Sequence, residues 1–368
     1  MDRKKLPIGI SDYKEIISED YYYVDKTDFI RQVIVEGSKI TLLPRPRRFG
    51  KTLNLSMLRY FFERTDGNIY RPLFEGKRIE QWKDYDKYQG KYPVIFVTLK
   101  DCKGETLEST LEKVADELQK EFIRHKYLLA DSTMESDYRP AFEALCGHRA
   151  TQSQIENSLR LLSDLLTRHW GMPPLVLLDE YDTPIHTAFD KGYYDLMIGF
   201  MRNFMSAVFK DNTDLFRGVV TGILRISKES IFSGLNNIDV DTILDHPMCT
   251  VFGFSQEEID RMLDDYSMGD TKVAVKEWYN GYLFAGKEVY NPWSALNFVN
   301  KGGVFSPYWV NTGSDVLLRY LLANGPTQIR QGIEALIQGD SIRSIINDKL
   351  AFPDLLSNPA NIWSFMLF

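Results

Sequence analysis

The sequence predicts an α/β protein in which a parallel sheet is flanked by helices. Four apolar runs alternate with longer stretches of helical spacing. Continuously apolar runs are typical of strands buried on both faces, and strands that alternate with helices form parallel, right-handed sheets. One strand-to-helix junction also carries Gly50-Lys51-Thr52, the residues with which a phosphate-binding loop ends.

The first predicted elements surround this junction. A short helix is expected over 28–35, N-capped by Thr27 or Asp25 and closed by Gly37. The apolar strand KITLLP then leads through the glycine-lysine loop into a helix over 53–64. Apolar residues recur in this helix every three or four positions, which predicts one buried face.

Three further strands and three long helices are expected before residue 250. The strands are YPVIFVTL at 92–99, PPLVLLDEYD at 173–182 and LFRGVVTGIL at 215–224, and the helices cover about 105–125, 152–169 and 193–209. Beyond residue 250 only helical patterns are expected. They are SQEEIDRMLDDY, TKVAVKEWYNGYLF, NPWSALNFVN, TGSDVLLRYLLAN and PTQIRQGIEALIQG.

Composition limits the classes of function. The net charge is −7, so the surface as a whole is not built to coat nucleic acid, although a local basic groove stays open. The three cysteines are far apart and form no CxxC pair, which indicates neither a zinc site nor a disulfide framework. We find no signal-peptide pattern and no run of about 18 apolar residues, so we expect a cytoplasmic protein that does not span a membrane.

The glycine-lysine loop departs from the usual pattern, GxxxxGK[ST]. Residues 45–52 read RPRRFGKT, so Arg45 stands where the first glycine is expected. In such a loop Lys51 contacts the β- and γ-phosphates and the Thr52 hydroxyl coordinates Mg²⁺. Gly50 lets the backbone approach the phosphates closely. GKT alone also occurs by chance, and the strand and helix around it supply the required context.

A second feature strengthens the nucleotide hypothesis. The strand LVLLDE ends in Asp179 and Glu180, where an aspartate would hold Mg²⁺ through water and a glutamate would polarise the attacking water. Alone, these carboxylates could equally cap a turn. Together with the loop, they predict a site for ATP or GTP with Mg²⁺, with Lys51 and Glu180 as the catalytic residues.

The end of the fourth strand offers two further candidates. Thr221 lies where ligands of open α/β sheets bind and could contact the γ-phosphate. Arg225 could reach a phosphate or the nucleotide of a neighbouring subunit. Each has a structural alternative: Thr221 is also an ordinary β-branched strand residue, and Arg225 could form a surface salt bridge.

Several stretches resemble a known family. LPIGISDYKEI, YYYVDKTDFI, PRPRRFGKTLNLSMLRYFFE, LLDEYDTPI and TGILRISKESIFSGLNN, with WYNGY and YNPWSALNF, are similar to the bacterial and archaeal AAA-ATPase-like proteins. These are relatives of the STAND and archaeal P-loop ATPases. The resemblance runs over nearly the whole chain and implies ATP as the nucleotide. The family's loop is itself typically RPRRFGKT. The resemblance implies Lys51 and Thr52 for the phosphates and Mg²⁺, and Asp179 and Glu180 for Mg²⁺ and water. The full set expected to bind ATP is Arg47, Arg48, Phe49, Gly50, Lys51, Thr52, Leu53 and Thr221, although Arg47 and Arg48, which match the family's paired arginines, could instead have a structural or regulatory role.

The resemblance also organises the chain. It implies an N-terminal segment packing on the core (1–38), a P-loop ATPase core (39–250) and a helical lid-like region (251–345). Residues 346–368 would begin a further region, because the apolar end PANIWSFMLF is an unusual place for a domain to stop. Family members usually carry a PD-(D/E)XK nuclease-like domain next, through which DNA would be a partner.

The expected function is Mg²⁺-dependent ATP binding with slow or partner-stimulated hydrolysis, as a switch for an attached effector domain. We identify no convincing arginine finger, a group worth about 10³–10⁵ in rate, which is why hydrolysis is expected to be slow. The alternative is an ATP-binding regulatory module without significant hydrolysis. A P-loop kinase is disfavoured by the tandem carboxylates and by the lack of a candidate acceptor site. Whether the chain forms a homo-oligomer stays open.

Overall fold

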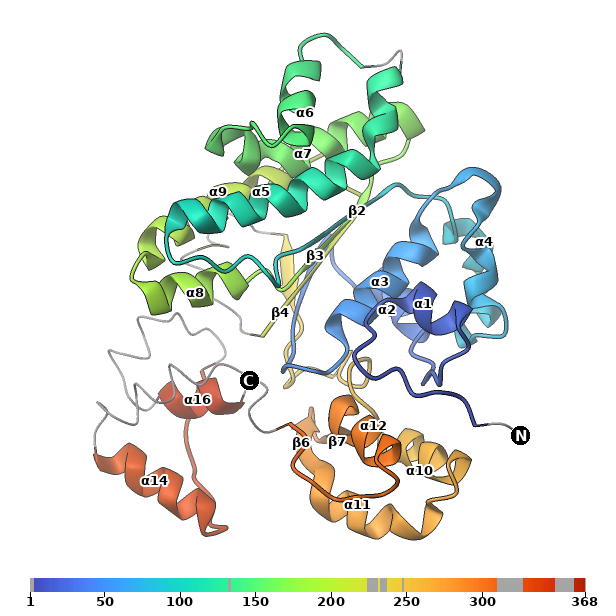
Figure 1. Cartoon of the computed structure of the whole chain (residues 1–368), viewed down its shortest axis with the longest axis vertical. Coiled ribbons are helices and arrows are strands. Elements are labelled where there is room, and N and C mark those ends of the chain that lie inside the picture. Colours follow the sequence, from blue (N-terminus) through green and yellow to red (C-terminus); the bar gives the residue numbers. More distant parts are fainter. Residues whose placement is uncertain are drawn as a thin grey trace.

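A computed structural model describes residues 3–131, 134–223, 231, 237–246, 248–309, 327–347 and 361–367. Their centre is a five-stranded sheet in the order β2-β3-β4-β1-β5 (Figure 1). The strands are β1 (Ile40–Pro44), β2 (Val94–Thr98), β3 (Leu175–Asp179), β4 (Arg217–Gly222) and β5 (Ile238–Val240). All neighbouring strands pair in parallel, as the alternation of strands and helices predicts.

The four predicted strands are confirmed, and a fifth was not predicted. β1 and β3 are buried at every position, which explains their continuous apolar runs. β5 is a three-residue edge strand with a partly exposed pattern, so its sequence, IDV, lacks that signal. β4 lies between β1 and β3 and therefore brings its own carboxyl end between the glycine-lysine loop and the strand that ends in Asp179.

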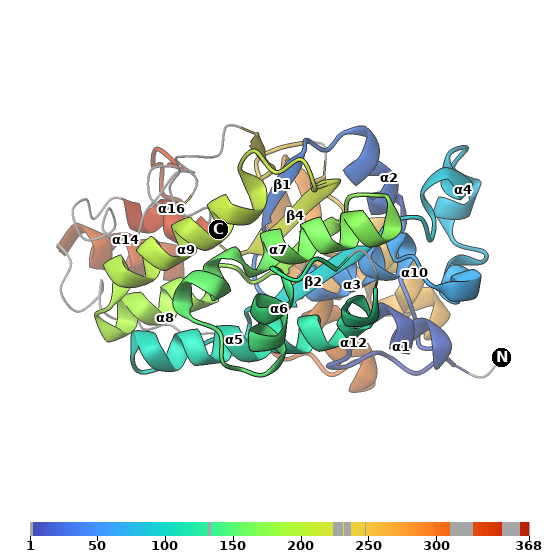
Figure 2. The same cartoon turned by 90° about the horizontal axis from the view of Figure 1, so that it is seen from above.

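Helices cover both faces of the sheet (Figures 1 and 2). Leu42 of β1 belongs to the core beneath α5, α7 and α9, whereas Leu43 belongs to the core beneath α2 and α3. This alternation follows from the two-residue period of a strand. The helices of the two layers are α1 (Tyr13–Ser18), α2 (Asp28–Val35), α3 (Lys51–Phe62), α4 (Tyr85–Tyr88), α5 (Leu107–Arg124), α6 (Arg139–Cys146), α7 (Gln152–Trp170), α8 (Thr183–Lys191) and α9 (Tyr194–Phe209).

Local sequence signals set several helix ends. α5 and α7 begin with capping boxes at Thr106 and Thr151, in which the hydroxyl accepts from a backbone N–H of the first turn. α2 has the predicted bounds and follows Thr27. The Thr27 hydroxyl donates to Asp25 instead of capping the helix. Short 3₁₀ helices complete this part: η1 (Asp66–Asn68), η2 (Arg71–Phe74), η3 (Arg78–Gln81) and η4 (Lys126–Ala130).

Beyond the sheet lies a separate helix–hairpin unit, residues 254–300, with its own apolar core (Figure 1). It comprises α10 (Gln256–Asp265), η5 (Gly269–Thr271), α11 (Lys272–Tyr279), β6 (Asn280–Phe284), β7 (Lys287–Tyr290) and α12 (Pro292–Asn300). The prediction of a helix through TKVAVKEWYNGYLF is wrong in its second half. Asn280 and Gly281 end α11, and Ala285 and Gly286 have positive φ and form the turn of an antiparallel hairpin.

The last described elements are α14 (Thr327–Ile337) and α16 (Ile362–Leu367). Ile329 of α14 and Ile362 of α16 join the core beneath α8 and α9. The helix expected over 312–324 lies outside the described residues. Within the described ranges no helix is long and apolar enough to cross a membrane.

Candidate nucleotide site

The glycine-lysine loop joins β1 to α3 at the carboxyl edge of the sheet. Arg48 (φ 67°) and Gly50 (φ 82°) both have left-handed backbone, which is unusual for an arginine and ordinary for glycine. Gly50 is the N-cap of α3, and no side chain caps that helix end. The first-turn N–H groups of α3 therefore point toward the loop, where a helix terminus attracts anions.

Lys51 is a buried cation without a carboxylate partner among the described residues. It is 5% exposed, and its ammonium donates to the carbonyl oxygens of Arg45 (3.0 Å) and Pro46 (3.1 Å). Burial lowers the pKa of Lys51, while the nearby Glu180 carboxylate acts in the opposite direction. Burying a charge is unfavourable, and the hydrogen-bond acceptors of the Lys51 ammonium are neutral carbonyls, so an anion bound beside Lys51 would be favoured.

Asp179 is the centre of a hydroxyl cluster. Its fully buried carboxylate accepts from Thr52 (2.7 Å) and Thr98 (3.2 Å) at Oδ2, and from Thr221 (2.7 Å) at Oδ1. These groups come from α3, β2 and β4, so the fold brings the predicted Thr52, Asp179 and Thr221 together. The cluster offers carboxylate and hydroxyl oxygens, and Mg²⁺ prefers oxygen ligands.

The sequence did not identify Thr98 as a member of this cluster. It is the last residue of β2 and lies directly beside Asp179 in the β2–β3 register. Within YPVIFVTL it is an ordinary strand residue, since threonine is common in strands. Its position at the carboxyl end of the strand, which it shares with Thr221, is the signal that could have revealed it.

Glu180 follows Asp179 with a strained backbone. Its φ is 50°, a left-handed conformation that is costly for a residue with a side chain. The carboxylate accepts from the Thr183 hydroxyl (3.2 Å), and Glu180 lines the cavity in front of the loop. This turn holds the carboxylate of Glu180 on the loop side of the sheet edge.

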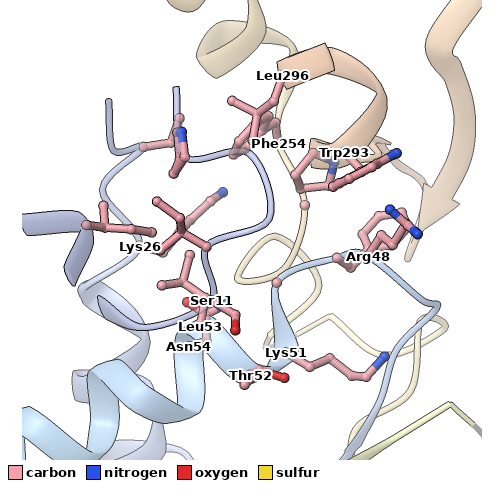
Figure 3. Close-up of a pocket in the computed structure, with 18 of the residues that line it drawn as sticks. Ser11, Lys26, Arg48, Lys51, Thr52, Leu53, Asn54, Phe254, Trp293 and Leu296 are labelled. Atoms are coloured by element: carbon pink, nitrogen blue, oxygen red, sulfur yellow. The ribbon is translucent and has the colours of Figure 1, made fainter. Parts of the chain in front are cut away.

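A cavity of about 290 Å³ opens beside the loop (Figure 3). One wall is the predicted loop and the start of α3, from Arg48 to Asn54, and a second is the N-terminal segment, including Pro7, Ile10 and Ser11. The third wall is the helix–hairpin unit, through Phe254, Trp293 and Leu296. The guanidinium of Arg48 lies 4.0 Å from the ring centre of Trp293, and both side chains lie side by side at the edge of the cavity in Figure 3.

The remaining predicted contacts occupy different surroundings. Leu53 and Phe49 line the cavity, and the Phe49 ring also packs against Tyr282 and Phe284 of the hairpin. Arg47 is exposed and is not part of the cavity wall, while its carbonyl oxygen accepts from Asn291 (3.5 Å). Arg225 lies outside the described residues.

A strand, a loop ending in Gly-Lys-Thr and a helix, with a buried aspartate two strands away, define the class of P-loop nucleoside triphosphatases. The chain belongs to a family described as Predicted AAA-ATPase, whose model matches residues 7–232, more than half of its length. It is also 31% identical, over 325 residues (88% of the chain), to an "Uncharacterized protein in vnfD 5'region" of Azotobacter chroococcum mcd 1. The chain spans 57% of the length of that relative.

Proposed function

We propose that this chain binds ATP with Mg²⁺ and hydrolyses it slowly, or when a partner stimulates it, as a switch for an attached effector domain. The observation that carries the proposal is the buried Lys51 ammonium, held only by loop carbonyls, next to the Thr52–Asp179 pair. Membership of the Predicted AAA-ATPase family supports ATP binding. The cytoplasm is the expected compartment.

The residues present fit the phosphates and the metal. Lys51 and the first-turn amides of α3 would bind the β- and γ-phosphates. Thr52 and Asp179 would hold Mg²⁺, which usually keeps few protein ligands and shares the phosphate oxygens and water. Thr221, bonded to the other Asp179 oxygen, would keep that carboxylate oriented and face the γ-phosphate. When bound, Mg²⁺ would neutralise charge that develops on the phosphates.

The cavity beside the loop would take the base and the sugar. Phe254, Trp293 and Leu296 give it an apolar wall, and its volume is near the lower end of small-molecule sites, roughly 300–1,000 Å³. The match to the Predicted AAA-ATPase family favours adenine as the base. The helix–hairpin unit would then act as a lid over the base.

Glu180 would orient the attacking water and accept its proton. This role requires the carboxylate to lie beside the γ-phosphate, and its position next to Lys51 on the cavity wall supports that placement. The contact with Thr183 would hold the side chain on this side of the strand end. If the chain instead has no significant hydrolytic activity, it would be an ATP-binding regulatory module.

The test compares phosphate release and nucleotide binding in the wild type and in Glu180→Gln. The variant keeps the size and the hydrogen bonding of the side chain but loses its charge. We expect unchanged Mg·ATP binding and loss of phosphate release. Equal rates of release in the two proteins would remove Glu180 from the mechanism, and no release from either, with or without a partner, would favour the binding module.

DNA is the partner that the family implies, through a nuclease-like domain attached to the ATPase. The basic residues considered for a DNA groove (Arg47, Arg48, Lys272 and Lys276) are too dispersed to form one, and Arg45 is fully buried. The ATPase rate should therefore be measured with and without DNA at several salt concentrations, because binding to phosphate backbones weakens steeply with salt. A rate that DNA does not change would exclude this chain as the element that DNA stimulates.

A further inference from the structure

Arg45 stands where phosphate loops usually have glycine, and its side chain points into the protein. It is the largest fully buried side chain of the described residues, at 0% exposed. One guanidinium nitrogen donates to the carbonyls of Pro44 (2.9 Å) and Asp241 (2.6 Å). The other donates to the Asp241 carboxylate and to the carbonyl of Met248 (3.3 Å). The guanidinium therefore points away from the cavity beside the loop, whose wall does not include Arg45.

The backbone of Arg45 fixes the entry of the loop. Its N–H donates to the carbonyl of Gly222 (3.0 Å), which continues the pairing of β1 with β4. Its own carbonyl oxygen accepts from the Lys51 ammonium (3.0 Å). Pro44 and Pro46 flank Arg45, and a residue before proline is confined to extended backbone. The position of the lysine therefore depends on how Arg45 is held.

The same stretch of chain holds the other end of the loop. We call residues 241–246 and 248–253 the connecting segment, since it leads from β5 to the helix–hairpin unit. Gly253 of this segment donates its N–H to the carbonyl of Phe49 (3.3 Å). A side chain at Gly253 would collide with Phe49 and Val289, because the backbone of Gly253 lies directly against these two residues. Arg45 and Phe49 begin and end the stretch RPRRF that precedes Gly50. Both residues are therefore hydrogen-bonded to the connecting segment.

A stabilising role alone does not explain a buried arginine. Removing an ion pair from water is costly, and well-packed apolar residues are often as stable or more stable. The Arg45 Nε atom is also buried without a hydrogen-bond partner among the described residues, which adds to the cost. Unlike an apolar contact, the ion pair fixes the orientation of its partners, because a planar guanidinium forms hydrogen bonds with several acceptors in a fixed geometry.

We propose that Arg45 is a positioning residue of the nucleotide site. Through Asp241 and Met248 it replaces the missing glycine by fixing the entry turn of the phosphate loop, and it ties that turn to the connecting segment. Nucleotide binding at the loop is thereby coupled to the helix–hairpin unit. The inference rests on the proposed function and adds an unusual consequence: restoring the general motif weakens binding.

The test is a set of three variants assayed for Mg·ATP binding by calorimetry. Arg45→Gly recreates GxxxxGKT, but it leaves the buried Asp241 without its partner and the protein could fail to fold. The double variant Arg45→Met/Asp241→Leu removes both charges together and avoids that problem. Arg217→Met is the matched control, because Arg217 also bonds backbone carbonyls, those of Ile34, Gly37 and Ser38, but at the opposite edge of the sheet.

We expect both Arg45 variants to bind at least about tenfold more weakly than the wild type, because a displaced Lys51 would lose charge-assisted hydrogen bonds to the phosphates. Arg217→Met should lower the melting temperature and bind within about twofold of the wild type. Arg45 variants that bind as the wild type does, or that lose no more affinity than Arg217→Met, overturn the inference. A wild type that does not bind ATP overturns the proposed function instead.

A second measurement needs no variant. Hydrogen exchange in the wild-type chain, with and without Mg·ATP, should show slower exchange in the loop and also in the connecting segment. Protection confined to the loop and α3 would overturn the coupling, whether or not the Arg45 variants fold.

Discussion

The hydroxyls around Asp179 give a graded prediction for two isosteric substitutions, Thr221→Val and Thr98→Val. Both remove a hydroxyl donor and keep the shape of the side chain. Thr221 is fully buried and donates over 2.7 Å, which is the range of a charge-assisted bond. Thr98 is half-buried and donates over 3.2 Å, longer than most O–H···O bonds.

The distances set the expected magnitudes. Hydrogen bonds to charged groups contribute about 1.5–3 kcal/mol, so Thr221→Val should lower the free energy of unfolding by about 2–3 kcal/mol. Thr98→Val should lower it by about 1 kcal/mol or less, because its bond is long and water can replace it. Thr221→Ser and Thr98→Ser retain the hydroxyl and serve as controls for each position.

The assay is urea unfolding, followed by titration of Mg²⁺ at fixed ATP. We expect Thr221→Val to weaken the Mg²⁺ dependence of ATP binding more than Thr98→Val does, because it loosens the carboxylate that would hold the metal. A Thr221→Val protein with unchanged stability, or a larger loss from Thr98→Val, would falsify the view that Thr221 holds the Asp179 carboxylate more tightly than Thr98 does.

Two further predictions concern the lysine and the cavity. Burial lowers the pKa of Lys51 from the ordinary lysine value of 10.5, and phosphates favour the charged form. The affinity for ATP should therefore fall as pH rises through the lowered pKa of Lys51. A dissociation constant for ATP that stays constant up to pH 10.5 would contradict this. Trp293→Ala should weaken ATP binding about tenfold or more, because stacking of a base on an aromatic side chain contributes about 1–3 kcal/mol, and should leave binding of inorganic tripolyphosphate unchanged. Trp278→Ala, also in the helix–hairpin unit but half-exposed and not part of the cavity wall, is the control, and an equal loss from both tryptophan variants would argue against a base in the cavity.

The sequence was sufficient for the sheet and for part of the site. β1 to β4 have continuous apolar runs because both of their faces are buried, and burial is a property that composition reports directly. Lys51 follows the loop after β1, and Asp179 and Thr221 lie at or next to the ends of β3 and β4. Parallel strands place their carboxyl ends at one edge of the sheet. The hypothesis of a nucleotide site therefore needed only local patterns.

The rest depends on contacts between distant parts of the chain. The partner of Arg45 is Asp241, and nothing near either residue indicates the pairing. The arginine of the loop with left-handed backbone is Arg48, and not Arg45 at the glycine position. The β-hairpin was also missed, because aromatic residues such as Tyr282 and Phe284 fit a helix or a strand until packing on Phe49 decides between them.

The central claim is that Lys51 lies in a site for the phosphates of ATP. Its most direct test is calorimetric titration of Mg·ATP into the wild-type chain and into Lys51→Ala. Loss of one or two charge-assisted hydrogen bonds, at about 1.5–3 kcal/mol each, predicts saturable binding by the wild type and binding weaker by at least about tenfold in the variant. Undiminished binding by Lys51→Ala would contradict the assignment of the site.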